Sequence, residues 1–263
     1  MKTLEESIAT AMESQDVEIV PFIPYILQDF WDMGTPPEIV INLIQKHCIV
    51  VETRHATFLP RVLDLGCGKG AVSVQLAAAL KCNCYGIDGI PEFIETSKEK
   101  AREYGVDELC RFEVGDIRKK IEDLDKFDVI ILGAIGQVFG DYYETLTTLS
   151  KHLTPKGIII INDAYIEDSS AFQHPAVLHH KELLRQIVQA GMELIDVNTS
   201  EETDNSAEYA KQFENIQKRC RELIAKYPEK TSIFDNYIQT QVYEYDALEN
   251  KMIGSIFVIK KQT

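Results

Sequence analysis

The stretch from Arg61 to Gly70 constrains the fold of this chain more than any other. An apolar run, Val62 to Leu65, breaks abruptly into a turn with three glycines, and apolar residues at helical spacing follow. A strand that leads through a glycine turn into a helix brings bare backbone N–H groups up to a ligand. The stretch therefore predicts a ligand-binding turn at the end of a buried strand.

Strand and helix patterns alternate along the chain from residue 61 onward. Short apolar runs indicate the strands, and the segments between them carry apolar residues at helical spacing. This alternation is typical of a parallel sheet covered by helices on both faces. We expect seven strands, at 61–65, 84–87, 110–114, 127–132, 158–161, 192–197 and 253–259. The pattern predicts an α/β fold with a doubly wound, mostly parallel sheet, in which 155–157 forms a turn.

The N-terminal residues read as helices, with capping-box patterns that begin at Thr3 and at Thr35. Between these helices, the segment 21–31 is unusually aromatic and includes Tyr25 and Trp31, the only tryptophan. One interpretation is a hydrophobic segment that packs on the main domain. The other is an N-terminal helical lid over a ligand, with Tyr25 or Trp31 facing it.

We divide the chain into a helical lid, 1–50, and a main domain, 51–263. The main domain carries a helical cap inserted between the sixth and seventh strands, at about 199–250. Asn205 or Ser206 can cap the first of these helices.

The charge balance limits the partners of the chain. Lys and Arg number 27 and Asp and Glu 42, which gives a formal net charge of −15. This balance repels phosphate backbones and argues against nucleic acid. We find no signal-peptide pattern and no apolar stretch long enough to cross a bilayer, so we expect no membrane association and a cytoplasmic protein. The six cysteines lack metal-site spacing, so we expect reduced thiols and no metal.

The spacing of the glycines bears on the ligand. A dinucleotide-binding turn has the pattern G-x-G-x-x-G, whereas Gly66, Gly68 and Gly70 are spaced one residue more tightly. Asp64 lies inside the strand, two residues before the first glycine. A carboxylate there suits a ligand with positive charge and disfavours a pyrophosphate.

Further polar positions follow the next three predicted strands. Asp88 ends the second strand, where a carboxylate can accept hydrogen bonds from both hydroxyls of a ribose. Asp116 follows the third strand and can receive an exocyclic amine such as that of adenine, and Gly133 leaves backbone exposed after the fourth. Because the carboxyl ends of parallel strands meet at one edge, these positions predict a site for a nucleoside without phosphates.

These motifs carry a family resemblance. The stretch Leu63–Gly70 resembles motif I of the class I S-adenosylmethionine-dependent methyltransferases, and Gly86–Asp88, Gly115–Ile117 and Leu153–Gly157 resemble later motifs of that family in their usual order. The nearest likeness is to small-molecule methyltransferases of the ubiquinone-biosynthesis-like type. The resemblance implies a Rossmann-like fold and S-adenosyl-L-methionine as the cofactor.

The resemblance also implies roles for individual residues. Asp88 would bind the ribose and Asp116 would lie near the adenine. Gly66 and Gly68 would lie against the methionine moiety, with Asp64 near its amino group, directly or through water. The full set of expected cofactor-binding residues is Asp64, Gly66, Cys67, Gly68, Asp88, Gly89, Asp116, Ile117, Gly133, Tyr25 and Trp31.

The sulfonium of the cofactor already activates the methyl group, so the protein must mainly align a nucleophile and exclude water. We expect a small-molecule methyl acceptor. Where a base is needed, the candidates are Asp163, Tyr165 and His174, which lie beyond the fourth and fifth strands. Aromatic and acidic residues at 237–245 would suit a cationic or amine acceptor, although an ordinary amphipathic helix explains them equally well.

Two other functions stay open at this point. The chain could bind S-adenosylmethionine without catalysis, as a regulatory or scaffold protein, or it could be an NAD-dependent oxidoreductase. The sequence leaves open which acceptor is used, whether carbon, nitrogen, oxygen or sulfur accepts the methyl group, whether a base takes part, and whether the protein is a homodimer.

Overall fold

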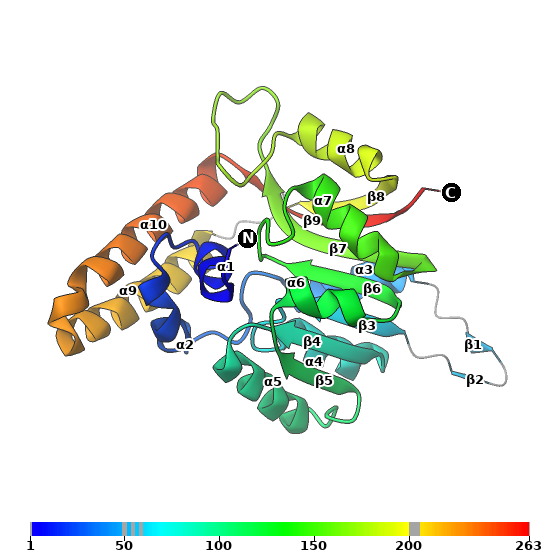
Figure 1. Ribbon diagram of the computed structural model, residues 1–263, viewed down its shortest axis with the longest axis horizontal. Helices are drawn as coiled ribbons and strands as arrows, with labels where there is room; N and C mark the ends of the chain where they lie inside the picture. The colour runs from blue at the N-terminus through cyan, green and yellow to red at the C-terminus, as the bar shows by residue number, and fades with distance from the viewer. Residues whose placement is uncertain (1, 49–51, 54–55, 58–59, 200–205, 263) are drawn as a thin grey trace. The chain divides into compact units, whose positions relative to one another are not determined.

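The computed structural model describes residues 2–48, 52–53, 56–57, 60–199 and 206–262 (Figure 1). The chain forms two compact units, each assembled from separate segments. The helical unit comprises Met1–Phe30, Ala164–His180 and Thr199–Ser255. The sheet unit comprises Trp31–Asp163, Lys181–Asn198 and Ile256–Thr263.

A sheet of seven strands organises the sheet unit, in the order β5-β4-β3-β6-β7-β9-β8. The strands are β3 (Arg61–Leu65), β4 (Asn83–Asp88), β5 (Cys110–Val114), β6 (Phe127–Gly133), β7 (Leu153–Tyr165), β8 (Met192–Thr199) and β9 (Ile253–Lys261). The pairs β5-β4, β4-β3, β3-β6 and β6-β7 are parallel, and the sheet as a whole is mixed. The chain adds β4 and β5 on one side of β3 and then returns to add β6 and β7 on the other side, so the strand order reverses between β3 and β6. Open α/β sheets bind ligands at such a reversal point. A short antiparallel pair, β1 (Glu52–Thr53) with β2 (Ala56–Thr57), is separate from it.

Helices cover both faces of the sheet. One face packs against α3 (Pro37–His47), α4 (Ala71–Leu80) and α5 (Pro91–Glu103), whose apolar side chains share a core with β3, β4 and β6. Figure 1 shows α3 and α4 behind the sheet and α6 and α7 in front of it. The remaining helices that follow strands are α6 (Ile117–Lys120), η2 (Ile121–Asp123), α7 (Tyr142–Leu149), η3 (Ser150–His152) and α8 (His180–Gln189). The predicted α/β fold with a doubly wound, mostly parallel, seven-stranded sheet is confirmed.

Two local predictions are wrong. The capping box at Thr35 does not form, because Pro36 precedes the first residue of α3 and the Thr35 hydroxyl instead accepts a hydrogen bond from Asn162 Nδ2 at 3.0 Å. The predicted turn at 155–157 is extended chain within β7. The ladder between β6 and β7 is irregular there, so the chain bulges without turning back.

The helical unit combines the N-terminal segment, Met1–Phe30, with two later segments of the chain. It contains α1 (Leu4–Ala11), η1 (Val17–Phe22), α2 (Ile23–Ile26), α9 (Ser206–Lys226), η5 (Pro228–Lys230) and α10 (Thr231–Asn250). The capping box at Thr3 is present. Arg219 on α9 donates to both oxygens of Asp29, at 2.6 and 2.7 Å, and to Glu222, which also accepts from the Tyr25 hydroxyl. The N-terminal segment therefore packs on α9 within one unit.

The predicted division at 50/51 stays a prediction, since residues 49–51 lie outside the described part of the chain, as does Asn205. No helix in the part that the structure describes has both the length and the apolar character that crossing a membrane requires.

Candidate functional site

The glycine turn lies at the carboxyl end of β3, next to the point where the strand order reverses. Gly66, Gly68 and Gly70 have φ values of +72°, +53° and +75°, a region that residues with a Cβ seldom adopt. A Cβ on Gly66 would lie 2.5 Å from Ile135 Cγ2, and one on Gly68 would lie 2.3 Å from Met33 Cε. The left-handed backbone is the ground on which all three positions favour glycine, because Met33 Cε ends a flexible side chain and could move away from an added Cβ.

Asp88 closes β4 and holds the glycine turn. Its Oδ2 accepts from the Gly68 N–H at 2.9 Å and its Oδ1 from the Ile90 N–H at 2.8 Å. The Gly89 N–H also stabilises the charged form of this carboxylate. Burial raises the pKa of Asp88 to about 6, and the backbone donors oppose that rise. The carboxylate is therefore ionised at neutral pH, and its lone pairs retain capacity for a further donor.

Asp64 is a second buried carboxylate at this end of the sheet. It is 3% exposed and accepts from the Ser73 hydroxyl at 2.7 Å. Burial raises its pKa to about 6, Ser73 lowers it, and the charge of Asp88 raises it again. The neighbouring Cys67 thiol is buried, and that burial holds its pKa well above the ordinary range, so it stays protonated. Two carboxylates so placed favour a ligand that brings hydrogen-bond donors or positive charge.

Residues 31–35 cover the turn within the sheet unit. Trp31 Nε1 donates to the carbonyl oxygen of Lys69 at 3.0 Å, and the Trp31 ring lies 5.1 Å from that of Tyr104. Tyr104 itself is 45% exposed. Met33 reaches Gly68, and Thr35 reaches Gly133, where an added Cβ would lie 2.6 Å from Thr35 Oγ1. The structure therefore brings Trp31 and Gly133 together with the turn.

Asp116 and Ile117 begin α6. The Asp116 carboxylate caps the helix and accepts from Arg118 Nε at 2.9 Å and from its terminal nitrogen at 2.8 Å. Arg118 lowers the pKa of Asp116, so this carboxylate is ionised and engaged by a guanidinium. Ile117 is buried. The expectation that Asp116 receives the adenine amine stays a prediction.

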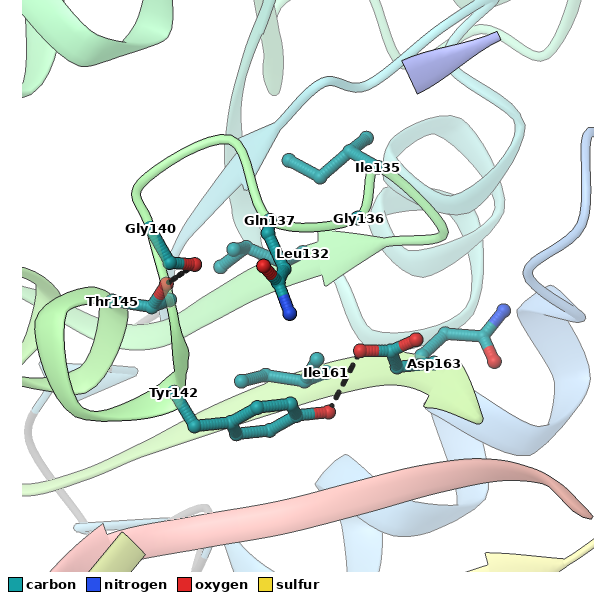
Figure 2. A pocket seen from close by; sticks show the side chains of 10 residues that line it. Leu132, Ile135, Gly136, Gln137, Gly140, Tyr142, Thr145, Ile161 and Asp163 are labelled. Atoms are coloured by element: carbon teal, nitrogen blue, oxygen red, sulfur yellow. Dashed lines mark hydrogen bonds between the residues drawn. The ribbon is translucent and has the colours of Figure 1, made fainter. Parts of the chain in front are cut away.

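A pocket opens beside the ends of β6 and β7, and Figure 2 shows its lining. The Tyr142 hydroxyl, from the first turn of α7, donates to Asp163 Oδ2 at 2.9 Å. The ten lining residues are Leu132, Ile135, Gly136, Gln137, Gly140, Tyr142, Thr145, Ile161, Asn162 and Asp163. Sequence reasoning named Asp163 but missed Tyr142, because Tyr142 belongs to no motif and only the fold pairs it with Asp163.

Three other predicted site residues belong to the helical unit. The Tyr165 ring lies 4.6 Å from that of His180. His174 Nε2 lies 3.3 Å from a Glu244 oxygen, and its ring stacks with those of Phe172 and Tyr243. Tyr25 binds Glu222, as described above. The roles predicted for Tyr25, Tyr165 and His174 stay predictions.

Among residues 2–48, 52–53, 56–57, 60–199 and 206–262, no group of three or more His, Cys, Asp or Glu side chains is arranged to hold a metal ion.

Comparison with known proteins decides the family. The model of a methyltransferase domain matches residues 59–218, more than half of the chain. The chain belongs to this methyltransferase-domain family. A probable cobalt-precorrin-6B C(15)-methyltransferase (decarboxylating) of Methanothermobacter thermautotrophicus is 29% identical over 105 residues, which are 40% of this chain and 53% of that protein. A ubiquinone biosynthesis O-methyltransferase of Rickettsia akari is 30% identical over 128 residues, 48% of this chain and 46% of the relative.

The methyltransferase domain thus spans about half the length of these curated relatives. A solved structure matches a far larger share of this chain. The S-adenosyl-L-homocysteine complex of a methyltransferase from Geobacter sulfurreducens superposes with a TM-score of 0.74 over 92% of this chain and 98% of that one, at 18% identity. This similarity shows that the two chains share their fold.

Proposed function

We propose that this methyltransferase-domain protein transfers a methyl group from S-adenosyl-L-methionine to a small-molecule acceptor. The observation that carries the proposal is the contact of Gly68 N–H with Asp88 Oδ2 at 2.9 Å, which joins the glycine turn to a buried carboxylate at the end of the next strand. The net charge of −15 supports a small acceptor over a nucleic acid.

The residues present suit this cofactor chemically. A ribose offers two hydroxyl donors and an amino acid offers an ammonium group, and Asp88 and Asp64 supply buried carboxylate acceptors for both. The same pair of negative charges disfavours a pyrophosphate, which argues against a dinucleotide. The positive φ values of the turn let the backbone approach a ligand without a Cβ in the way.

The proposed division of labour follows from these contacts. Asp88 would hold the ribose hydroxyls, Asp64 would face the amino group directly or through water, and Gly66 and Gly68 would lie against the methionine part. When bound, the cofactor supplies an electrophilic methyl group. The chain must then align the acceptor and exclude water, and Met33, Thr35 and Ile135, which contact the turn or its neighbour Gly133, suit the second task.

The same carboxylates predict a pH dependence. Asp64 and Asp88 have pKa values raised to about 6, so both are ionised at neutral pH and lose their charge as the pH falls through 6. Affinity for the cofactor should therefore decrease below pH 6. Titrations of S-adenosyl-L-homocysteine at pH 7.5 and pH 5 measure it, and equal affinities at the two values would contradict the assignment.

We also propose that the protein works in the cytoplasm. All six cysteines are free thiols, at positions 48, 67, 82, 84, 110 and 220, which supports a reducing compartment.

Methyl transfer tests the proposal directly. Protein incubated with S-adenosyl-L-methionine carrying a labelled methyl group, and with hydroxyl, amine, thiol and carbon-acid acceptors, should release S-adenosyl-L-homocysteine and a labelled product. Asp88→Ala should abolish most of this activity, whereas Asp107→Asn, at an exposed position after α5, should keep it. Tight cofactor binding without transfer to any acceptor class would instead favour a regulatory protein.

A further inference from the structure

We propose that Asp163 accepts the proton of an acceptor hydroxyl during methyl transfer, and that Tyr142 is the residue that positions Asp163 for this step. The inference rests on the proposed function and names the group that the pocket beside β6 and β7 receives.

The pocket and the glycine turn share Ile135 as a neighbour. Ile135 lines the pocket, and its Cγ2 is also the atom that a Cβ on Gly66 would meet at 2.5 Å. A small acceptor in the pocket would therefore contact a side chain that also lies beside the turn. Its walls are apolar at Leu132, Ile135 and Ile161, and Asp163 contributes the carboxylate among the lining residues.

Tyr142 is held rigidly enough to fix its partner. Asp141 caps α7 in a reciprocal capping box with Glu144, which sets the first turn of the helix where Tyr142 lies. The Tyr142 ring packs edge-on against Phe257, with 6.3 Å between ring centroids, and the residue is 6% exposed. Figure 2 shows its hydroxyl directed at Asp163, with the Gln137 side chain extending toward the same region.

The donor and acceptor in this pair are unambiguous. Burial and the negative charge of Asp163 raise the pKa of the Tyr142 phenol well above its ordinary range. The phenol therefore keeps its proton and donates to Asp163 Oδ2 at any working pH. A carboxylate fixed in this way is oriented but not neutralised.

The chemistry of a carboxylate favours a hydroxyl as the acceptor group. A carboxylate next to an amine stabilises the ammonium form, which has no lone pair to attack with. Next to a hydroxyl it takes the hydrogen bond and then the proton, so oxygen becomes the nucleophile. In the step, the acceptor oxygen forms a bond to the methyl carbon as the carbon–sulfur bond of the donor breaks. The electron pair of that bond stays on sulfur, and the hydroxyl proton moves to Asp163.

The first test uses 4-nitrophenol, whose visible absorbance follows the ionisation of its hydroxyl. Bound beside Asp163, the hydroxyl should ionise at higher pH than in water, with its ionisation constant lowered at least tenfold. Asp163→Asn should remove most of this shift, and Tyr142→Phe should remove more than half of it. Tyr143→Phe, on the exposed side of α7, and Asp125→Asn, in the exposed loop before β6, are matched controls that should keep it.

Several results would overturn the inference: no binding of 4-nitrophenol, an unshifted ionisation constant in the wild type, or an equal shift in wild type and Asp163→Asn. Calorimetry with S-adenosyl-L-homocysteine distinguishes a failure of this inference from a failure of the proposed function. Normal binding of this ligand with no probe shift refutes the inference alone, whereas no binding by the wild type refutes the proposed function. Because the phenylalanine replacement keeps the packing on Phe257, a folded Tyr142→Phe variant is expected. If it unfolds, Asp163→Asn alone decides.

A rate measurement distinguishes positioning from catalysis. With a hydroxyl acceptor, Tyr142→Phe should lower kcat and shift the acid limb of the pH profile while KM changes little. Unchanged kcat in this variant would show that Tyr142 serves only the packing of α7.

Discussion

Asp64→Asn should make the cofactor-free protein more stable while weakening the site. Asp64 is 3% exposed, and burial raises its pKa from its ordinary value of 3.8 to about 6. A pKa raised in the folded state means that the ionised form costs stability above that pKa and costs nothing below the unfolded value. At about 1.4 kcal/mol per unit, the cost at pH 7.5 is about 3 kcal/mol, and it decreases to about 1 kcal/mol at pH 4.5. The amide oxygen of the replacement can still accept from Ser73, so most of this cost should be recovered.

Urea unfolding at the two pH values measures the effect. The variant should exceed the wild type by about 2–3 kcal/mol at pH 7.5 and by about 1 kcal/mol or less at pH 4.5. Asp107→Asn, at an exposed position, should leave the free energy of unfolding unchanged at both. An equal gain at both pH values, or none, would refute the view that Asp64 is a buried charge kept at the expense of stability. The same variant should bind S-adenosyl-L-homocysteine more weakly.

Three further results are expected. Gly68→Ala forces a side chain into φ +53° beside Met33 and should lower the free energy of unfolding by about 1–2 kcal/mol, and unchanged urea midpoints would contradict this. Arg219→Gln removes the donors to Asp29 and should speed hydrogen exchange of the α2 amides; wild-type exchange rates there would count against the contact. Trp31, the only tryptophan, donates to the carbonyl oxygen of Lys69 in the turn, so its fluorescence should change when S-adenosyl-L-homocysteine binds. Unchanged fluorescence under saturating ligand would contradict the placement of the ligand beside Trp31.

The strands could be predicted well because their signal is local. The apolar run that ends at Leu65 and the one from 110 to 114 match β3 and β5 at their carboxyl ends, where glycine or acidic residues stop them. The strand order could not be predicted from the sequence, because no residue of β9 indicates that this strand inserts between β7 and β8. The turn predicted at 155–157 was wrong because a proline and a glycine also suit a bulge, and only the partner strand distinguishes the two.

Sequence motifs indicated the glycine turn and Asp88, whereas no motif indicated Tyr142. Gly68 of the glycine turn and Asp88 are 20 residues apart, and the structure joins them by a hydrogen bond. Tyr142 and Asp163 are 21 residues apart without a motif, and their contact depends on how α7 packs over β7. Thr35 was assigned to a helix cap because its sequence neighbours fit one, whereas its hydroxyl accepts from Asn162, a partner 127 residues away.

A calorimetric titration of S-adenosyl-L-homocysteine tests the central claim most directly. The wild type should bind it and should show no binding of NAD, and Asp88→Ala should bind it at least tenfold more weakly, because the loss of a charge-assisted hydrogen bond is worth about 1.5–3 kcal/mol. Binding of NAD in its place, or undiminished affinity in Asp88→Ala, would contradict the account.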